Sequence, residues 1–130
     1  MNAGSNYFWQ NLKYFANQIA CIDTSIGKSV TYADLETDSN TIAGKIKLSK
    51  KALIFLFTSN IYDCIATYIG ILKSGNAVLL LDEKLNDEIR NDLIITYKPE
   101  FVLTSNETPP ENYSLYFNQD SFGYLTFMLI

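Results

Sequence analysis

Side chains able to do chemistry are few in this sequence of 130 residues, which contains no histidine. The chain therefore lacks the commonest general base and the commonest metal ligand. Its two cysteines, Cys21 and Cys64, lie in apolar stretches, where free cysteine is often buried. A disulfide between them is disfavoured because nothing else in the sequence is typical of a secreted protein. We therefore expect neither a zinc site nor any other metal-binding residue.

Two acidic pairs, Asp82-Glu83 and Asp87-Glu88, could be read as acid/base or metal-binding pairs. Adjacent helical residues do not share a face, so a solvated loop and a helix N-terminus explain them better. The segment Gly70–Gly75 matches the start of a phosphate-loop pattern, but Asn76-Ala77 follow it where Lys and Ser or Thr are required. It also ends a helix instead of following a strand, which indicates a structural role.

Residues near the N-terminus offer only weak ligand-binding candidates. Thr31 and Asp34 have the spacing of a capping box, which usually serves only to begin a helix. Tyr32 could touch a ligand, but a tyrosine in the first turn of a helix is more often packed. An aromatic group could line a pocket, although docking on a hairpin or on a part outside this chain explains it better: Tyr7, Phe8, Trp9, Tyr14 and Phe15. We predict no catalytic and no cofactor-binding residue.

The charge balance excludes some classes of partner. The net charge is −4 and the pI about 4.6, so no basic face is expected to bind nucleic acid. The basic cluster Lys45, Lys47, Lys50 and Lys51 is interpreted as a solvated helix end. The longest apolar runs are too short to span a bilayer, and no signal peptide is evident at the N-terminus. A cytoplasmic protein without membrane contact is therefore expected.

The elements that must position these residues alternate between buried strands and amphipathic helices. Strands are predicted at 53–57, 78–81 and 101–104, the first two continuously apolar and buried. Right-handed crossovers between them favour a parallel sheet covered by helices. We therefore predict a three-layer α/β/α fold with a mainly parallel sheet, formed by residues 1–130 as a single domain.

The remaining elements follow from local signals. Residues 6–18 are predicted to be helical with Asn6 as a cap, residues 19–30 form a hairpin, and a helix runs from Thr31 to near Leu48. The next helix is expected to be capped from Thr58, Ser59 and Asn60 and to end at Gly75. Asn86 is predicted to cap a third helix, whose apolar stripe comprises Ile89, Leu93 and Tyr97.

Two segments carry a specific resemblance. Val30–Leu35 resembles the L-T-Y-x-E-L segment of the adenylate-forming (AMP-binding) superfamily, which includes acyl-CoA synthetases, luciferases and the adenylation domains of nonribosomal peptide synthetases. Leu72–Asp82 is similar to the L-K-A-G-x-A-Y-V-P-L-D segment of the same superfamily. Order, spacing and the intervening strand also fit, over about residues 19–105. The departures are Asp34 for Glu, Ser74 for Ala and Leu80 for Pro. They remove no catalytic group, because both motifs are chiefly structural in this superfamily.

The resemblance implies that the chain is the N-terminal subdomain of a larger AMP-binding domain. Such a parent uses ATP and Mg²⁺ to convert a carboxylic acid to an acyl-adenylate, and then passes the acyl group to a thiol. The superfamily's T-S-G-T-T-G-x-P-K loop and catalytic lysine are not found in these 130 residues. The chain alone is therefore expected to be inactive, with the remainder of the enzyme as its partner. A free-standing flavodoxin-like module that binds a small molecule or a protein is the alternative.

The last predicted strand, 124–130, is strongly apolar and carries neither charge nor proline. An exposed edge of this composition invites pairing with another chain. We therefore expect this segment to fold back over the sheet or to mediate self-association.

Overall fold

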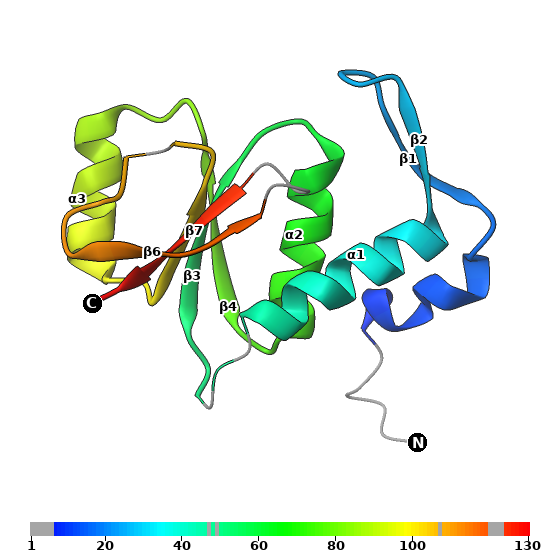
Figure 1. Cartoon of the computed structure of the whole chain (residues 1–130), viewed down its shortest axis with the longest axis horizontal. Coiled ribbons are helices and arrows are strands. Elements are labelled where there is room, and N and C mark those ends of the chain that lie inside the picture. The colour runs from blue at the N-terminus through cyan, green and yellow to red at the C-terminus, as the bar shows by residue number, and fades with distance from the viewer. Residues whose placement is uncertain (1–6, 47, 49, 107, 120–123) are drawn as a thin grey trace.

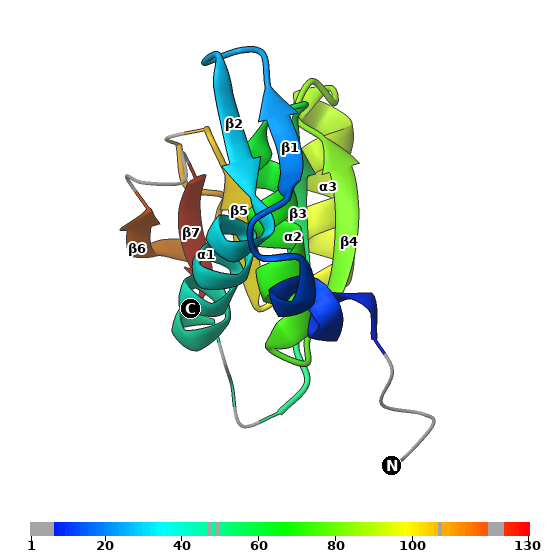
Figure 2. The ribbon, with the colours of Figure 1, turned by 90° about the vertical axis from the view of Figure 1, so that its right-hand side faces the viewer.

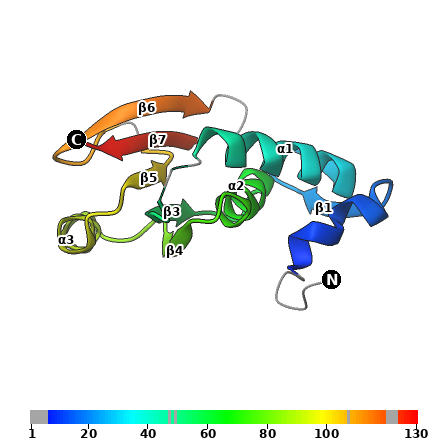
Figure 3. The same cartoon turned by 90° about the horizontal axis from the view of Figure 1, so that it is seen from below.

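The computed structural model describes residues 7–46, 48, 50–106, 108–119 and 124–130 (Figure 1). A five-stranded sheet forms the central layer, with helix α3 on one face and helices α1 and α2 on the other (Figure 3). A separate two-stranded hairpin projects beyond the sheet (Figure 2). The bounds are η2 Phe8–Phe15, β1 Ile19–Asp23, β2 Lys28–Thr31, α1 Tyr32–Lys45, β3 Leu53–Thr58, α2 Tyr62–Lys73, β4 Ala77–Asp82, α3 Asp87–Tyr97, β5 Phe101–Thr104, β6 Tyr113–Gln119 and β7 Tyr124–Leu129.

The sheet is mixed, with strand order β4-β3-β5-β7-β6. Strand β3 pairs in parallel with β4 and β5, as predicted for 53–57, 78–81 and 101–104. Strand β7 runs antiparallel to both of its neighbours, β5 and β6, so the expectation of a mainly parallel sheet holds only for the first three strands. Because β7 is paired on both sides, segment 124–130 presents no free edge.

Side-chain alternation along β3 divides the core into two clusters. Ile54 and Leu56 pack in the cluster formed with α1 and α2, whereas Phe55 and Phe57 pack in the cluster formed with α3. Strand β4 differs from the prediction of a second buried strand. It is an edge strand, and Leu79 and Leu80 are 36% and 47% exposed. A continuous apolar run indicates a strand but does not say what covers its faces.

Local helix signals are confirmed at three positions. The Thr31 hydroxyl accepts a hydrogen bond from the Asp34 amide at 3.2 Å, and the Asp34 carboxylate accepts one from the Thr31 amide at 3.2 Å. Helix α2 is followed by Gly75, whose φ of +83° favours glycine. The Asn86 side chain accepts a hydrogen bond from the Glu88 amide at 2.8 Å and so caps α3.

The N-terminal helix and the end of α1 differ from their predicted extents. The segment predicted as an α-helix over 6–18 is a 3₁₀ helix, η2, which packs on α1. Its proposed cap, Asn6, lies outside the described residues. Helix α1 ends at Lys45, short of Leu48, and its residues Leu35 and Ile42 are buried.

The predicted apolar stripe of α3 is confirmed only in part, because Leu93 packs against the core cluster that contains Phe55 and Phe57. Arg90 and Ile94 are its buried residues, whereas Ile89 and Tyr97 are 51% and 57% exposed. Arg90 can occupy a core position because its guanidinium lies 4.7 Å from the centre of the Phe57 ring. A stripe defined only by apolar residues misses a cation that stacks on an aromatic ring.

Candidate functional site

The carboxyl ends of β3 and β4 lie beside the hairpin and form a cleft. Residues 58–60 line both of its adjoining cavities, of about 500 Å³ and about 320 Å³. The larger cavity is bounded by the hairpin and α2, and the smaller one by Asp82, Glu83 and Lys84. Ligands of open α/β sheets bind at the carboxyl ends of the strands, so this cleft is the natural candidate site.

Asp23 joins the hairpin to the start of α2. Its carboxylate accepts hydrogen bonds from the Ser25 hydroxyl, from the Ser25 amide at 3.0 Å and from the Tyr62 amide at 2.9 Å. These hydrogen bonds, from Ser25 first and Tyr62 next, hold the pKa of Asp23 below its ordinary value. Asp23 therefore does what was predicted for Thr58, Ser59 and Asn60, none of which caps α2. The helix N-terminus that might have bound a phosphate is satisfied by the protein's own carboxylate.

The surroundings of the larger cavity are acidic. The Tyr62 hydroxyl donates a hydrogen bond to Asp38 at 2.6 Å, and burial, with this contact, raises the pKa of Tyr62. Burial also raises the pKa of Asp63, and the negative charges of Asp23 and Asp38 add to the effect. Carboxylates gathered in this way disfavour a polyphosphate ligand.

An apolar surface continues from this cleft over the outer side of α2 and β4. Cys64, Ile65 and Leu80 line the larger cavity and also a neighbouring apolar cavity of about 290 Å³. Ile65 and Leu80 are 43% and 47% exposed, and Ile22 on the hairpin is 63% exposed. A continuous apolar surface of this kind suits contact with another protein segment better than catalysis.

No catalytic arrangement is found among the described residues. Cys64 and Tyr124 are buried, and burial, with the nearby thiol of Cys64, raises the pKa of Tyr124. A raised pKa keeps the Tyr124 phenol protonated at neutral pH, so it is not available as a general base. Both cysteines are free, and no three histidine, cysteine, aspartate or glutamate side chains within the described ranges could together hold a metal ion.

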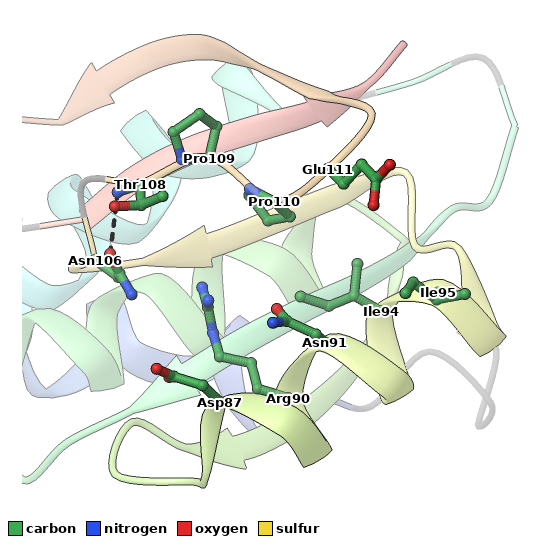
Figure 4. A pocket seen from close by; sticks show the side chains of 10 residues that line it. All are labelled: Asp87, Arg90, Asn91, Ile94, Ile95, Asn106, Thr108, Pro109, Pro110 and Glu111. Carbon is green, nitrogen blue, oxygen red and sulfur yellow. Dashed lines mark hydrogen bonds between the residues drawn. The ribbon is translucent and has the colours of Figure 1, made fainter.

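A further cavity, of about 390 Å³, lies on the face of the sheet that α3 covers (Figure 4). Its walls come from α3 and from the loop that joins β5 to β6. Arg90 lines it and is 7% exposed, and its Nη2 atom has no hydrogen-bond partner. Burial lowers the pKa of Arg90, and Asp87 partly offsets this effect. Arg90 was not predicted from the sequence. Its position four residues before Ile94, on the same face of the helix, could have indicated that it is buried.

Most residues singled out from the sequence have structural roles. Gly70 lies where α2 crosses α1, and a Cβ placed there would lie 2.7 Å from Ile42. Asp82 accepts a hydrogen bond from the Lys84 amide at 2.8 Å and ends β4, while Asp87 and Glu88 form the first turn of α3. These findings agree with the structural interpretation of both motifs.

The N-terminal aromatic residues surround η2. Tyr7 stacks on Trp9 with ring centres 4.5 Å apart, and Phe15 lies 6.0 Å from the ring of Tyr32. Trp9 and Tyr32 pack against the core, and Phe8 lines the small apolar cavity beside α2. The group therefore packs mainly on α1, which differs from the expected docking on the hairpin or on a part outside this chain. Only Phe8 of this group lines one of the cavities described above.

The described residues of the basic cluster lie at and after the end of α1. Lys45 lies in the last turn of α1, Lys50 and Lys51 are exposed, and Lys47 lies outside the described residues. Within the described part of the chain, no helix combines the length and apolar character needed to cross a membrane.

Comparison with known proteins reveals two kinds of similarity, while no family model matches the chain. The chain is 30% identical over 87 residues to the D-alanine–D-alanyl carrier protein ligase of Streptococcus pyogenes serotype M5 (strain Manfredo), and 31% identical over 87 residues to that of serotype M3 (strain SSI-1). Each alignment covers 65% of this chain and 17% of the relative, so the chain matches about one-sixth of the ligase's length.

The fold is similar to part of a luciferase-like enzyme from the nonluminescent mealworm Zophobas morio. The TM-score is 0.64 at 23% identity, covering 72% of this chain and 23% of that enzyme. The sequence similarity supports a relation to the adenylate-forming superfamily at the coarse level of an AMP-dependent ligase, and the structural similarity shows a shared fold. They do not separate its subfamilies.

Proposed function

We propose that this chain is the N-terminal structural part of a ligase that activates a carboxylic acid with ATP and transfers the acyl group to a thiol. The supporting observation is that both superfamily-like segments lie at structural junctions of a fold similar to that of a luciferase-like enzyme. Val30–Leu35 contains the capping box that begins α1. Leu72–Asp82 contains the end of α2, the turn at Gly75 and strand β4.

One residue of the second segment, Asn76, links three neighbouring elements. Asn76 is buried, and its side chain accepts a hydrogen bond from the Ala52 amide at 2.9 Å. It also donates one to the Ile46 carbonyl at 3.0 Å. One side chain thus ties together the end of α1, the start of β3 and the turn before β4. Such a motif positions a sheet without taking part in the reaction.

The remainder of the ligase is the proposed partner. The chain matches only 17% of the length of its ligase relatives, and the apolar surface of α2 and β4 is exposed. Strand β4 also has an unpaired edge, where a further segment can add by backbone hydrogen bonds. In this proposal, the chain supplies one wall and part of the sheet of the large catalytic domain.

ATP and Mg²⁺ are assigned to the remainder and not to this chain. The cleft at the ends of β3 and β4 presents Asp23, Asp82 and Glu83 against a single cation, Lys84, and the start of α2 is already capped. These residues do not fit a triphosphate. The isolated chain is accordingly proposed to be inactive. The alternative of a flavodoxin-like module is less well supported, because such sheets are parallel whereas β6 and β7 are antiparallel.

Split complementation tests the proposal. The D-alanine–D-alanyl carrier protein ligase of serotype M5 would be expressed without the segment that matches this chain, and D-alanine-dependent pyrophosphate exchange would be measured. Adding this chain in trans should raise the exchange rate above that of the truncated ligase alone. The ligase's own N-terminal segment is the positive control. Recovery with that segment but none with this chain would count against the proposal.

A further inference from the structure

The cavity between α3 and the β5–β6 loop contains a buried cation that the protein does not pair. Arg90 is 7% exposed, and its Nη2 atom has no hydrogen-bond partner. Among the described residues, no carboxylate lies within ion-pair distance of it, although Asp87 lines the same cavity. A buried charge without a hydrogen-bonded partner is costly, so a bound anion would remove a real penalty.

The ring of Phe57 satisfies only part of Arg90. The guanidinium carbon lies 4.7 Å from the ring centre, which uses one face of the planar group. The N–H donors lie in the plane of the guanidinium and point outward from its edge. The contact with Phe57 therefore explains how Arg90 is held, but does not satisfy its edge donors, of which Nη2 is buried without a hydrogen-bond partner.

Asn106 adds a second donor to the same cavity. Its side-chain oxygen accepts a hydrogen bond from the Thr108 amide at 3.0 Å, and this contact fixes the orientation of the side-chain amide. Figure 4 shows the amide nitrogen of Asn106 turned away from Thr108, on the side where Arg90 lies. Two donor groups thus line one cavity, and the natural ligand atom between them is an acceptor oxygen.

The other walls restrict the class of ligand. Asp87 and Glu111 line the cavity and oppose a second negative charge, so a singly charged anion is favoured over a dianion such as phosphate. Ile94, Ile95 and the two prolines 109 and 110 provide apolar surface beside the donors. The volume of about 390 Å³ lies within the range of small-molecule pockets.

We infer that this cavity binds a small monocarboxylate, whose oxygens bond Arg90 and Asn106 and whose short apolar body contacts the isoleucine and proline side chains. This site is distinct from the cleft at the ends of β3 and β4, because it lies on the face of the sheet that α3 covers and shares no lining residue with that cleft. The inference does not rest on the proposed ligase role, and either one can fail alone.

The test is an NMR titration of the whole 130-residue chain with three probes: sodium butyrate, butan-1-ol and inorganic phosphate. Butyrate should cause saturable amide shifts confined to residues 87–95, 106, 108 and 111. Butanol has a similar apolar body without the charge and should cause no saturable shift in these residues. Phosphate should bind at least about tenfold more weakly than butyrate. Absence of saturation with butyrate, or equal binding of butanol or phosphate, would overturn the inference.

Substitution of Arg90 provides the second arm. Arg90→Met keeps an unbranched apolar side chain over Phe57 but removes the donors, and should weaken butyrate binding at least about tenfold. Lys13→Met makes the same charge change in η2, on the other side of the sheet, and should leave binding unchanged. Undiminished binding by a folded Arg90→Met chain would refute the assignment. If that variant does not fold, the comparison of butyrate with butanol in the unmodified chain still decides.

Discussion

Asp23 is the residue on which the hairpin and α2 most depend. It comes from the end of β1, yet its carboxylate replaces the missing side-chain cap of a helix that begins almost forty residues later in the sequence. A charged acceptor at the positive end of a helix forms stronger hydrogen bonds than a neutral one. Helix α2 is therefore stabilised at its N-terminus only when the hairpin holds Asp23 beside the Tyr62 amide.

Substitution of Asp23 is expected to change the stability of the chain by an amount that depends on pH. Its pKa is lower in the folded chain than its ordinary value, so the contribution to stability is present above that ordinary value and is lost as the pH falls through the folded pKa. Asp23→Asn should therefore lower the melting temperature at pH 7. The difference between variant and unmodified chain should shrink on acidification below about pH 4.

Thermal melting between pH 7 and pH 3, followed by circular dichroism, measures this difference. Asp92→Asn is the matched control, because Asp92 is an exposed residue of α3. That variant should melt like the unmodified chain across the series. A difference for Asp23→Asn that stays constant with pH would show that the carboxylate charge is not responsible.

At the scale of elements, the packing of α1 against α2 depends on a glycine. A Cβ built on Gly70 would lie 2.7 Å from both Cβ and Cγ2 of Ile42 and 3.0 Å from the Ser39 carbonyl oxygen. Backbone atoms and a branched side chain cannot move aside cheaply in a packed core. The glycine that superficially suggested a phosphate loop is thus required by the close approach of two helices.

A pair of Gly→Ala substitutions tests this explanation. Gly70→Ala should destabilise the chain by about 1–3 kcal/mol, the cost of overpacking. Gly44→Ala places the same methyl group in α1, where nothing lies within 4 Å, and should stabilise by about 0.4–1 kcal/mol. Urea denaturation of both variants measures the change in the free energy of unfolding, which should fall for Gly70→Ala and rise for Gly44→Ala. Equal effects would mean that helix propensity alone, and not the helix contact, governs Gly70.

Elements whose signals are local could be predicted from the sequence, and those that depend on distant partners could not. The capping box at Thr31, the turn at Gly75 and the Asn86 cap each involve neighbours in the chain, and all three are observed. The cap of α2 comes instead from Asp23, and the buried residue of α3 is Arg90 stacked on Phe57. Both contacts join segments far apart in the sequence, which no local pattern encodes.

The candidate site was predictable to a smaller extent than the fold. Structural roles for Gly70 and for the acidic pairs were predicted correctly, because Asn76-Ala77 break the phosphate-loop pattern and adjacent helical residues do not share a face. It gave no indication that α3 and the β5–β6 loop would enclose Arg90, since the cavity exists only after β5 pairs beside β3. A site built from the packing of layers appears only in three dimensions.

At the scale of the whole molecule, the strand order of the mixed sheet places β7 inside the sheet and β4 at an edge. Association is therefore expected at β4 and not at segment 124–130. Segment 124–130 was expected to fold back over the sheet or to mediate self-association, but β7 lies between β5 and β6 and its backbone is paired on both sides. The edge strand on the other side of the sheet is β4, which pairs only with β3 and exposes Leu79 and Leu80. The apolar surface of α2 and the hairpin adjoins this edge.

We therefore expect the isolated chain to self-associate through the β4 edge at high concentration. Burying each large apolar side chain is worth roughly 1.5–3 kcal/mol, and a free strand edge adds backbone hydrogen bonds. Leu80→Lys places a charge on this edge and should shift the chain toward the monomer in sedimentation velocity experiments. Ile95→Lys puts the same charge on an exposed position of α3, 59% exposed, and should leave association unchanged. A strictly monomeric unmodified chain would exclude β4 as the associating surface. Equal effects of the two lysines would exclude it as well, because a contact at the β4 edge should be weakened by a charge at Leu80 and not by the same charge at Ile95.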